Sequence, residues 1–131
     1  MHSRRLTLRI RPESFAICRL EPGAALPGWL PSRGFTATVR AEDELCVYCE
    51  AAAVPQDVRA VRNWRALQLL GPFDFSESGV IASVAGPLAE AGISIAVLAT
   101  YDTDYIFVRD DALESAAEIL QAGGHRVVGP D

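Results

Sequence analysis

The chain has 131 residues, half of them apolar and 22% charged, which is typical of a compact folded protein rather than a disordered segment. Its longest apolar runs, such as 95–99, fall far short of the roughly 20 residues that a membrane-spanning helix needs. The basic first residues are not followed by an apolar segment, so export is not indicated and we expect a cytoplasmic protein. Three cysteines, an odd number, argue against a disulfide framework and fit a reducing compartment.

Charge is distributed unevenly along the chain. All 12 basic residues are arginines, and the net charge is −5. Residues 1–65 hold 10 arginines against 7 acidic residues, whereas 66–131 hold 2 arginines against 10 acidic residues. Because an acidic surface repels phosphate backbones, we expect no nucleic-acid partner, and we also expect no membrane partner.

The first half of the sequence predicts strands. Short alternating or β-branched and aromatic runs occupy 6–10, 14–20, 35–40 and 44–49, each bounded by turn-forming residues. Between them, Pro22, Pro27 and Pro31 prevent a long helix. This half is therefore expected to be mostly β.

The second half begins with a predicted strand at 65–70 that stops at Gly71-Pro72. Residues 78–91 then have apolar side chains at helical spacing, with Ser76 or Ser78 as the N-cap and Gly92 as the C-terminal stop. Pro87 lies inside this helix and lacks an N–H group, so we expect a kink or a bound water there.

The remaining elements are a buried apolar strand at 93–100, a turn at 101–104 and a partner strand at 105–109. A last helix, capped by Asp110 or Asp111 and ended by Gly123-Gly124, precedes a closing strand at 125–128. The order β-α-β-β-α-β predicts an α+β, ferredoxin-like fold, with an antiparallel sheet and both helices on one face. Because this topology hosts many functions, the fold alone does not decide the function.

Three segments in this half, GPFDFS at 71–76, GVIASVAGPLAEAGISI at 79–95 and TYDTDYIFV at 100–108, resemble the ACT domain. The resemblance is greatest to small stand-alone bacterial ACT proteins and to the related domains of aspartate kinases and CASTOR arginine sensors. It covers 64–128 and is weaker for 1–63. It implies two tandem units, a strand-rich, helix-poor and degenerate ACT-like unit at 1–63 and a complete ACT domain at 64–131.

The resemblance also implies a function. ACT domains bind an amino acid or a similar small molecule where two units meet, and they commonly form dimers. We therefore expect a non-enzymatic regulatory homodimer, with its ligand at the loop 73–80 near the turn 100–104. The alternatives are a structural or protein-interaction ACT domain without a ligand, and an enzyme of unrecognised type.

The residues around that loop suit an amino acid. The start of a helix offers unpaired backbone N–H groups to a carboxylate, and nearby carboxylates offer acceptors to an ammonium group. The candidate ligand-binding residues are Asp74, Phe75, Ser76, Glu77, Ser78, Gly79, Val80, Thr100, Asp102 and Asp104. Several of these residues can also be interpreted as purely structural. Asp74, Ser76 and Glu77 fit helix caps, and Asp102 and Asp104 fit ordinary turn residues.

Other motifs favour no catalytic or metal site. Cys46 and Cys49 match C-x-x-C, but residues three apart on a strand point to opposite faces. We interpret His125 as a surface or strand-edge residue rather than a general base, and the glycines lack the spacing of a phosphate-binding loop. We therefore expect no metal, no cofactor and no catalytic residue.

Overall fold

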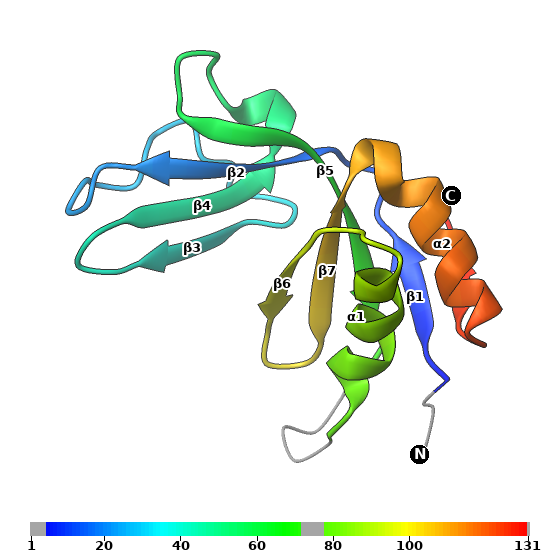
Figure 1. The fold of residues 1–131 in the computed structure, drawn as a ribbon. Helices are drawn as coiled ribbons and strands as arrows, with labels where there is room; N and C mark the ends of the chain where they lie inside the picture. The colour runs from blue at the N-terminus through cyan, green and yellow to red at the C-terminus, as the bar shows by residue number, and fades with distance from the viewer. Residues whose placement is uncertain (1–4, 72–77, 131) are drawn as a thin grey trace. The chain divides into compact units, whose positions relative to one another are not determined.

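The computed structural model describes residues 5–71 and 78–130 (Figure 1). The chain divides into two compact units, which are 13–64, here called the β unit, and 1–12 together with 65–131, here called the α/β unit. Strand β5 (Ala60–Leu69) contributes residues to both. The sequence analysis grouped 1–12 with the first unit, whereas in the structure these residues belong with 65–131. No helix within the described ranges is long and apolar enough to cross a membrane.

The β unit is an antiparallel sheet without an α-helix, and every one of its residues is described. Its strands are β2 (Phe15–Leu20), β3 (Ala37–Arg40), β4 (Leu45–Glu50) and the first half of β5, in the order β3-β4-β2-β5. A short 3₁₀ helix, η1 (Ala51–Ala53), follows β4. The predicted strands and the absence of a helix in the proline-rich 21–36 segment are therefore confirmed.

The core of the β unit lies on one face of its sheet. The buried side chains of β4 alternate with partly exposed ones, as a half-buried strand requires, whereas in β2 the adjacent Phe15 and Ala16 are both buried. The proline-rich segment packs against this face through Trp29 and Leu30, and so takes the place that a helix would fill. The buried members of the cluster are Ala16, Cys18, Val47, Cys49 and Val54.

The α/β unit has the predicted β-α-β-β-α-β order over 60–128, with an additional strand. Its elements are β1 (Thr7–Ile10), the second half of β5, α1 (Val80–Glu90), β6 (Ile95–Ala99), β7 (Asp104–Arg109), η2 (Asp110–Ala112), α2 (Leu113–Ala122) and β8 (Arg126–Val128). The strand order is β6-β7-β5-β1-β8. Strand β1 is antiparallel to β5 and parallel to β8, with Leu8 opposite both Leu69 and Val127.

The fully antiparallel sheet predicted from 65–128 was therefore wrong. Strand β1 inserts between β5 and β8, so β8 has a parallel neighbour instead of pairing with β5. The reason lies in the core, because the β1 residues Leu8 and Ile10 are buried in the same cluster as Leu67 and Leu69 of β5.

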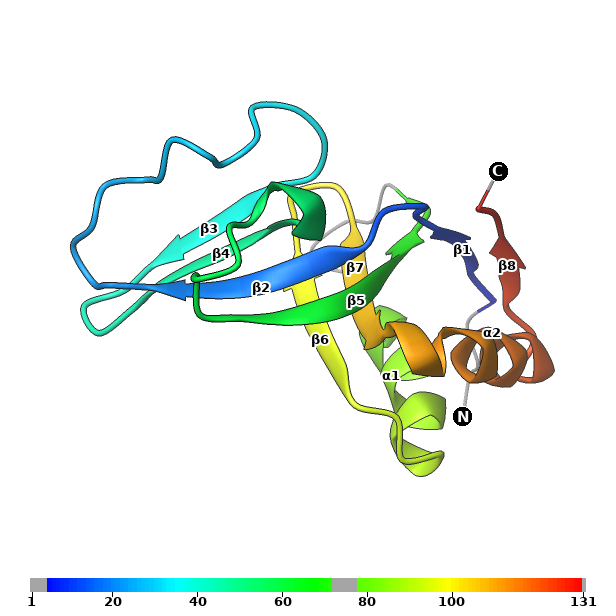
Figure 2. The same ribbon diagram turned by 90° about the horizontal axis from the view of Figure 1, so that it is seen from above.

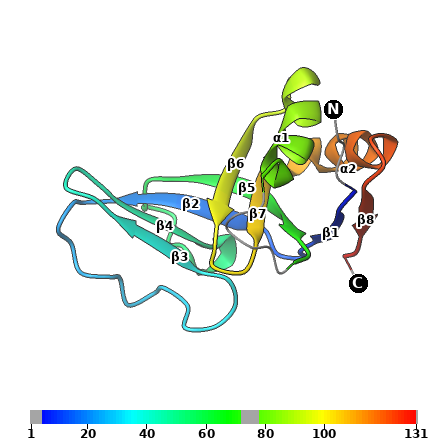
Figure 3. The ribbon, with the colours of Figure 1, turned by 90° about the horizontal axis from the view of Figure 1, so that it is seen from below.

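Both helices pack on the same face of this sheet, as predicted (Figure 2). The view from below shows the same arrangement of α1 and α2 against the strands of their own unit (Figure 3). Val80, Val84 and Leu88 of α1 and Ala116 and Leu120 of α2 fill the core between the helices and the sheet. The helical spacing predicted these positions together with Ile81, Ala91, Leu113 and Ala117, of which Ala91 is exposed and the other three are partly buried.

The two helices end as predicted but begin differently. Each ends in a left-handed glycine, Gly92 at φ +77° and Gly124 at φ +98°, and the N–H of the following residue bonds back to the helix. Helix α1 begins after Gly79, without a side-chain cap, so Ser78 is not the cap, and Ser76 lies outside the described residues. Asp110 and Asp111 do not cap α2, because they form the 3₁₀ turn η2 and Ala112 precedes the helix.

The interpretation of His125 as a surface residue was wrong. Its side chain is only 6% exposed, and its Nδ1 atom accepts a hydrogen bond of 3.1 Å from the Leu6 N–H. The proton is therefore on Nε2, which donates to the Ser83 carbonyl at 3.0 Å. Four residues after Ser83, Pro87 has no N–H to bond this carbonyl. His125 therefore supplies the donor that the proline removes, where we expected a kink or a bound water.

Strand β6 is also less buried than predicted. It pairs with β7, has no second partner among the described residues and so forms an edge of the sheet in its own unit. Val97 is 39% exposed and Ala99 is exposed as well. An apolar sequence was a poor guide to burial here, because a strand at an edge has one neighbour fewer.

Candidate functional site

The turn between β6 and β7 is closed by two threonines. The Thr100 N–H donates to the Thr103 carbonyl at 2.7 Å, and the Thr100 hydroxyl donates to the same oxygen at 3.0 Å. In return the Thr103 N–H donates to Thr100 Oγ1 at 3.3 Å. These bonds fix the loop that carries Tyr101 and Asp102, both of which are exposed to solvent.

The same turn is attached to the end of β5. Thr103 is 8% exposed, and its hydroxyl donates a hydrogen bond to the Leu69 carbonyl. Leu69 is the last residue of β5, so this bond holds the turn beside the residues that follow the strand. Asp102 is thereby positioned next to the chain at Leu70 and Gly71.

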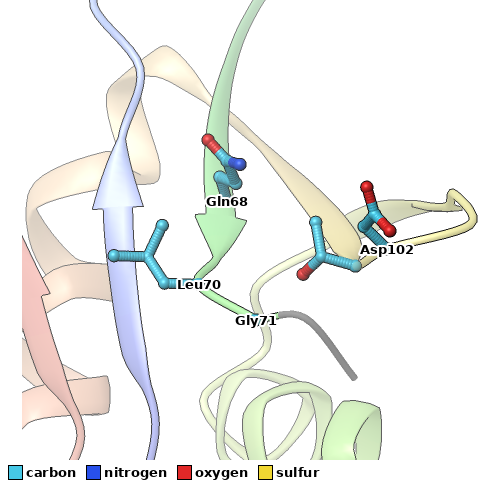
Figure 4. A pocket seen from close by; sticks show the side chains of 5 residues that line it. Gln68, Leu70, Gly71 and Asp102 are labelled. Atoms are coloured by element: carbon cyan, nitrogen blue, oxygen red, sulfur yellow. The ribbon is translucent and has the colours of Figure 1, made fainter. Parts of the chain in front are cut away.

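A pocket of about 330 Å³ lies where these two segments meet (Figure 4). An amide and a carboxylate supply polar groups, and Leu70 supplies an apolar surface. This volume is near the lower end of the range for small-molecule sites, which is roughly 300–1,000 Å³. Among the described residues, the pocket is lined by Gln68, Leu70, Gly71, Asp102 and Thr103.

The side chain of Gln68 has a hydrogen-bond partner outside the residues that line the pocket. Its Oε1 atom accepts a hydrogen bond from Arg11 Nη1 at 3.2 Å. Arg11 in turn is held by its backbone, since its N–H donates to the Ala66 carbonyl at 2.9 Å and its carbonyl accepts from Arg65 Nη2 at 3.0 Å. The amide of Gln68 is thus oriented by a residue from the other end of the sequence.

The start of α1 is open. Ser78 and Gly79 are exposed, and a Cβ atom added to Gly79 would meet nothing within 4 Å. The backbone of Gly79 has φ +81°, and its carbonyl accepts the Ser83 N–H at 3.1 Å as α1 begins. Val80 points into the core and is 6% exposed, so its backbone N–H is the only part of it suited to a ligand.

The structure brings only some of the predicted site residues together. Asp102 lines the pocket, Thr100 lies behind it and closes the turn, and Asp104 lies on β7 opposite Ala99. Partial burial raises the pKa of the Asp104 carboxyl above its usual value. Asp74, Phe75, Ser76 and Glu77 lie outside the described residues.

Sequence reasoning missed Gln68, Leu70 and Thr103. The available signal was that Gln68 is a polar residue between two buried leucines of a strand, which places it on the opposite face. Thr103 stands between two aspartates, and nothing in that local pattern shows that its hydroxyl bonds to Leu69.

The three cysteines are free and do not form a metal site. Cys18 and Cys49 are buried on the core face of the β unit, whereas Cys46 lies on the other face, as its spacing from Cys49 predicts. Burial raises the pKa of the Cys18 thiol to about 11, with the neighbouring Cys49 adding to the shift. Within 5–71 and 78–130 no group of three or more His, Cys, Asp or Glu side chains could hold a metal ion.

Two family models match the chain, one in each half. The model of an ACT domain matches residues 59–122. A model described as an N-terminal domain matches residues 13–57. The ACT model covers β5 to α2 and leaves out β1 and β8, and it begins at residue 59, within the β unit of the structural division.

Several solved structures share the fold. A protein from Agrobacterium tumefaciens is 38% identical with a TM-score of 0.92, over 98% of this chain and 96% of that one. A Vibrio cholerae protein of unknown function, titled a possible transport protein, is 24% identical with a TM-score of 0.74, over 91% and 90% of the two chains. The regulatory subunit of aspartate kinase from Thermus thermophilus is 12% identical with a TM-score of 0.61, over 88% and 96%, and shows likeness of fold alone.

A curated relative is the human protein named cytosolic arginine sensor for mTORC1 subunit 1. It is 41% identical over 59 residues, which make up 44% of this chain and 18% of the sensor. The bovine protein of the same name matches equally well. The chain thus spans under a fifth of the length of these relatives.

The family matches agree with the two-unit fold, its helix-free first unit and the complete β-α-β-β-α-β second unit. The chain belongs to the ACT domain family and is related to amino-acid-sensing domains.

Proposed function

We propose that this chain is a non-enzymatic regulatory ACT protein that binds an amino acid beside the β6–β7 turn. The observation that carries the proposal is the pocket between the end of β5 and this turn, which joins Gln68 and Asp102 to the apolar Leu70. The kinship with a protein named as an arginine sensor favours an amino-acid ligand.

The proposed site extends from the pocket toward the start of α1. The backbone N–H groups at Gly79 and Val80 are suited to a carboxylate, because the cap and the first turn of a helix leave their N–H groups without partners inside the helix, and the proposal adds the exposed Ser78 just before them. From the sequence, the proposal adds Asp74, Phe75, Ser76 and Glu77 to this site. Thr100 supports the turn, and Asp104 at the end of the turn adds negative charge nearby.

Binding at this place would join segments that are distant in sequence. The pocket residues come from 68–71 and from 102–103, and the only side-chain bond described between these segments is that of Thr103 to Leu69. A ligand would therefore stabilise the turn against the end of β5, which is a route for regulation by stabilising one conformation. The three free cysteines support the cytoplasm as the site of action.

We also propose that the protein is a homodimer. Strand β6 has the apolar sequence IAVLA, lies at a sheet edge of its unit and exposes Val97. Edges of this kind pair readily when they lack charged side chains. This surface also favours the second candidate function, a protein-interaction ACT domain without a ligand.

Thermal unfolding of the purified protein with each of the twenty amino acids tests the proposal. A ligand at 100 times its Kd stabilises the folded state by about 2.7 kcal/mol, which raises Tm by several degrees in a protein of this size. We expect a shift with one amino acid or a few similar ones. Unchanged Tm values across the whole panel would reject the ligand and leave the interaction domain.

Two variants show where a ligand binds. Asp102→Asn removes the carboxylate of the pocket, and Asp57→Asn is the matched control, an exposed aspartate in the β unit. We expect the first to reduce the ligand-induced shift and the second to leave it unchanged. Glu77→Ala is expected to weaken binding at least tenfold, and an unchanged affinity would remove Glu77 from the site.

A further inference from the structure

The start of the chain presents arginines on the face of β1 that points away from the core. The even-numbered side chains of 6–10 are buried in the core of the α/β unit. Side chains along a strand alternate between its two faces, so Arg5, Thr7 and Arg9 point to the opposite face. Both arginines are exposed to solvent, and Thr7 is partly buried between them.

Strand β8 adds a third arginine to this face. It runs parallel to β1 with Thr7 directly opposite Arg126. The next residue, Val127, packs against the core, so Arg126 points to the outer face, where it is exposed. The side chain of Arg5 extends toward the same segment, because its Nε atom lies 3.6 Å from the position that a Cβ atom on Gly124 would occupy.

Thr7 is therefore surrounded by hydrogen-bond donors. Arg5 and Arg9 stand two residues before and after it, about 7 Å away along an extended chain, and Arg126 stands beside it on β8, about 5 Å away. A guanidinium group only donates hydrogen bonds, and the hydroxyl of Thr7 can donate as well. These four residues, Arg5, Thr7, Arg9 and Arg126, are called the arginine cluster below.

The arginine cluster has no acidic neighbour in the sequence. Residues 5–11 and 124–130 contain no aspartate or glutamate, although the chain as a whole carries a net charge of −5. In the part of the chain that the structure describes, no carboxylate forms an ion pair with Arg5, Arg9 or Arg126. The positive charge of the arginine cluster is therefore available to an anion from outside the chain.

We propose that the arginine cluster binds a phosphate group, carried by a phosphate monoester or a diphosphate. Arginine binds phosphate oxygens through two parallel N–H groups, and a phosphate offers more oxygens and more negative charge than a carboxylate does. A single carboxylate would leave some of the clustered donors without a partner. This site lies on β1 and β8 and does not depend on the ligand proposed for the β6–β7 turn.

Isothermal titration calorimetry with pyrophosphate at physiological salt tests the proposal, because salt screens attraction that depends on net charge alone. We expect binding at one site. The double variant Arg9→Gln with Arg126→Gln should weaken it about tenfold or more, since each arginine supplies charged hydrogen bonds, and Thr7→Val should weaken it less. The matched control is Arg33→Gln with Arg40→Gln, which removes two exposed arginines of the β unit and should leave Kd unchanged.

Three results would overturn the proposal. They are no binding at millimolar pyrophosphate, equal weakening by the control pair, and a polyglutamate peptide that binds as tightly as pyrophosphate does. The last result would mean that the arginine cluster accepts any acidic segment. Circular dichroism of the variants identifies any loss of binding that is caused by unfolding.

A second measurement identifies the source of the phosphate. Phosphatidic acid has a phosphate monoester as its headgroup, so the protein is sedimented with vesicles that contain this lipid. Sedimentation with the vesicles that is lost in Arg9→Gln with Arg126→Gln supports the site and assigns a lipid headgroup. Binding of pyrophosphate without sedimentation supports the site and assigns a soluble phosphorylated molecule.

Discussion

The hydrogen bonds of His125 lead to a quantitative prediction. Replacing His125 with Phe keeps a flat ring of similar size but removes both ring nitrogens. The buried N–H of Leu6 and the carbonyl of Ser83 then lose their partners. An unpaired buried group costs about 1–3 kcal/mol, so we expect a loss of about 3 kcal/mol in the free energy of unfolding. Urea unfolding followed by circular dichroism measures this loss.

A second substitution separates the two bonds. Pro87→Ala restores an N–H group four residues after Ser83, where it can donate to the carbonyl that His125 normally bonds. Pro87→Ala should therefore raise the free energy of unfolding of the His125→Phe protein by about 1 kcal/mol more than it raises that of the wild-type protein. The four proteins form a double-mutant cycle.

Two results would refute this reasoning. A loss below about 0.5 kcal/mol in His125→Phe would mean that water or a local shift satisfies the two backbone groups at little cost. Strict additivity of the two substitutions would mean that Pro87 and His125 do not share the Ser83 carbonyl.

Three further predictions concern other parts of the chain. Thr103→Val leaves the Leu69 carbonyl without its donor, so urea unfolding should show a loss of about 1–2 kcal/mol, and no loss would mean that the turn is held by other contacts. Gly79→Ala should cost about 1 kcal/mol through its φ of +81°, since no atom of the described residues lies within 4 Å of the added Cβ; a Tm that rises would contradict this. Because burial raises the pKa of Cys18 to about 11, the folded chain keeps this proton at pH values where the unfolded chain releases it. Stability should be complete below pH 9 and fall by roughly 2–3 kcal/mol as pH rises to 11, and Cys18→Ala should reduce that fall.

Local patterns in the sequence were sufficient to predict most of the helices and strands. The apolar spacing of 80–90 and 113–122 and the glycines after them predicted both helices and their ends, because those signals act within a few residues. Strand β1 was grouped with residues 1–63 rather than with the α/β unit, because its alternating pattern shows that it is a strand but not which strands it joins. The predicted side-chain caps were wrong because Gly79 and the η2 turn begin the helices in other ways.

The site was only partly predictable for a related reason. Asp102, which the sequence analysis proposed as a site residue, lines the pocket, but the orientation of the Gln68 amide depends on its hydrogen bond with Arg11, which lies 57 residues away. The burial of His125 likewise depends on Ser83 and Leu6, which are 42 and 119 residues away. Contacts between residues so far apart in the sequence form only when the chain packs, so the sequence around each residue does not predict them.

The placement of β1 between β5 and β8 has a consequence for the order of folding during synthesis. Residues 13–64 are contiguous and can fold as soon as they leave the ribosome, whereas the sheet of the α/β unit joins residues 7–10 to 126–128. At a synthesis rate of about 5–20 residues per second, β1 waits several seconds for β8. During that time the edge of β1 that pairs with β8 remains open, so the α/β unit completes its sheet only after residues 126–128 have been made.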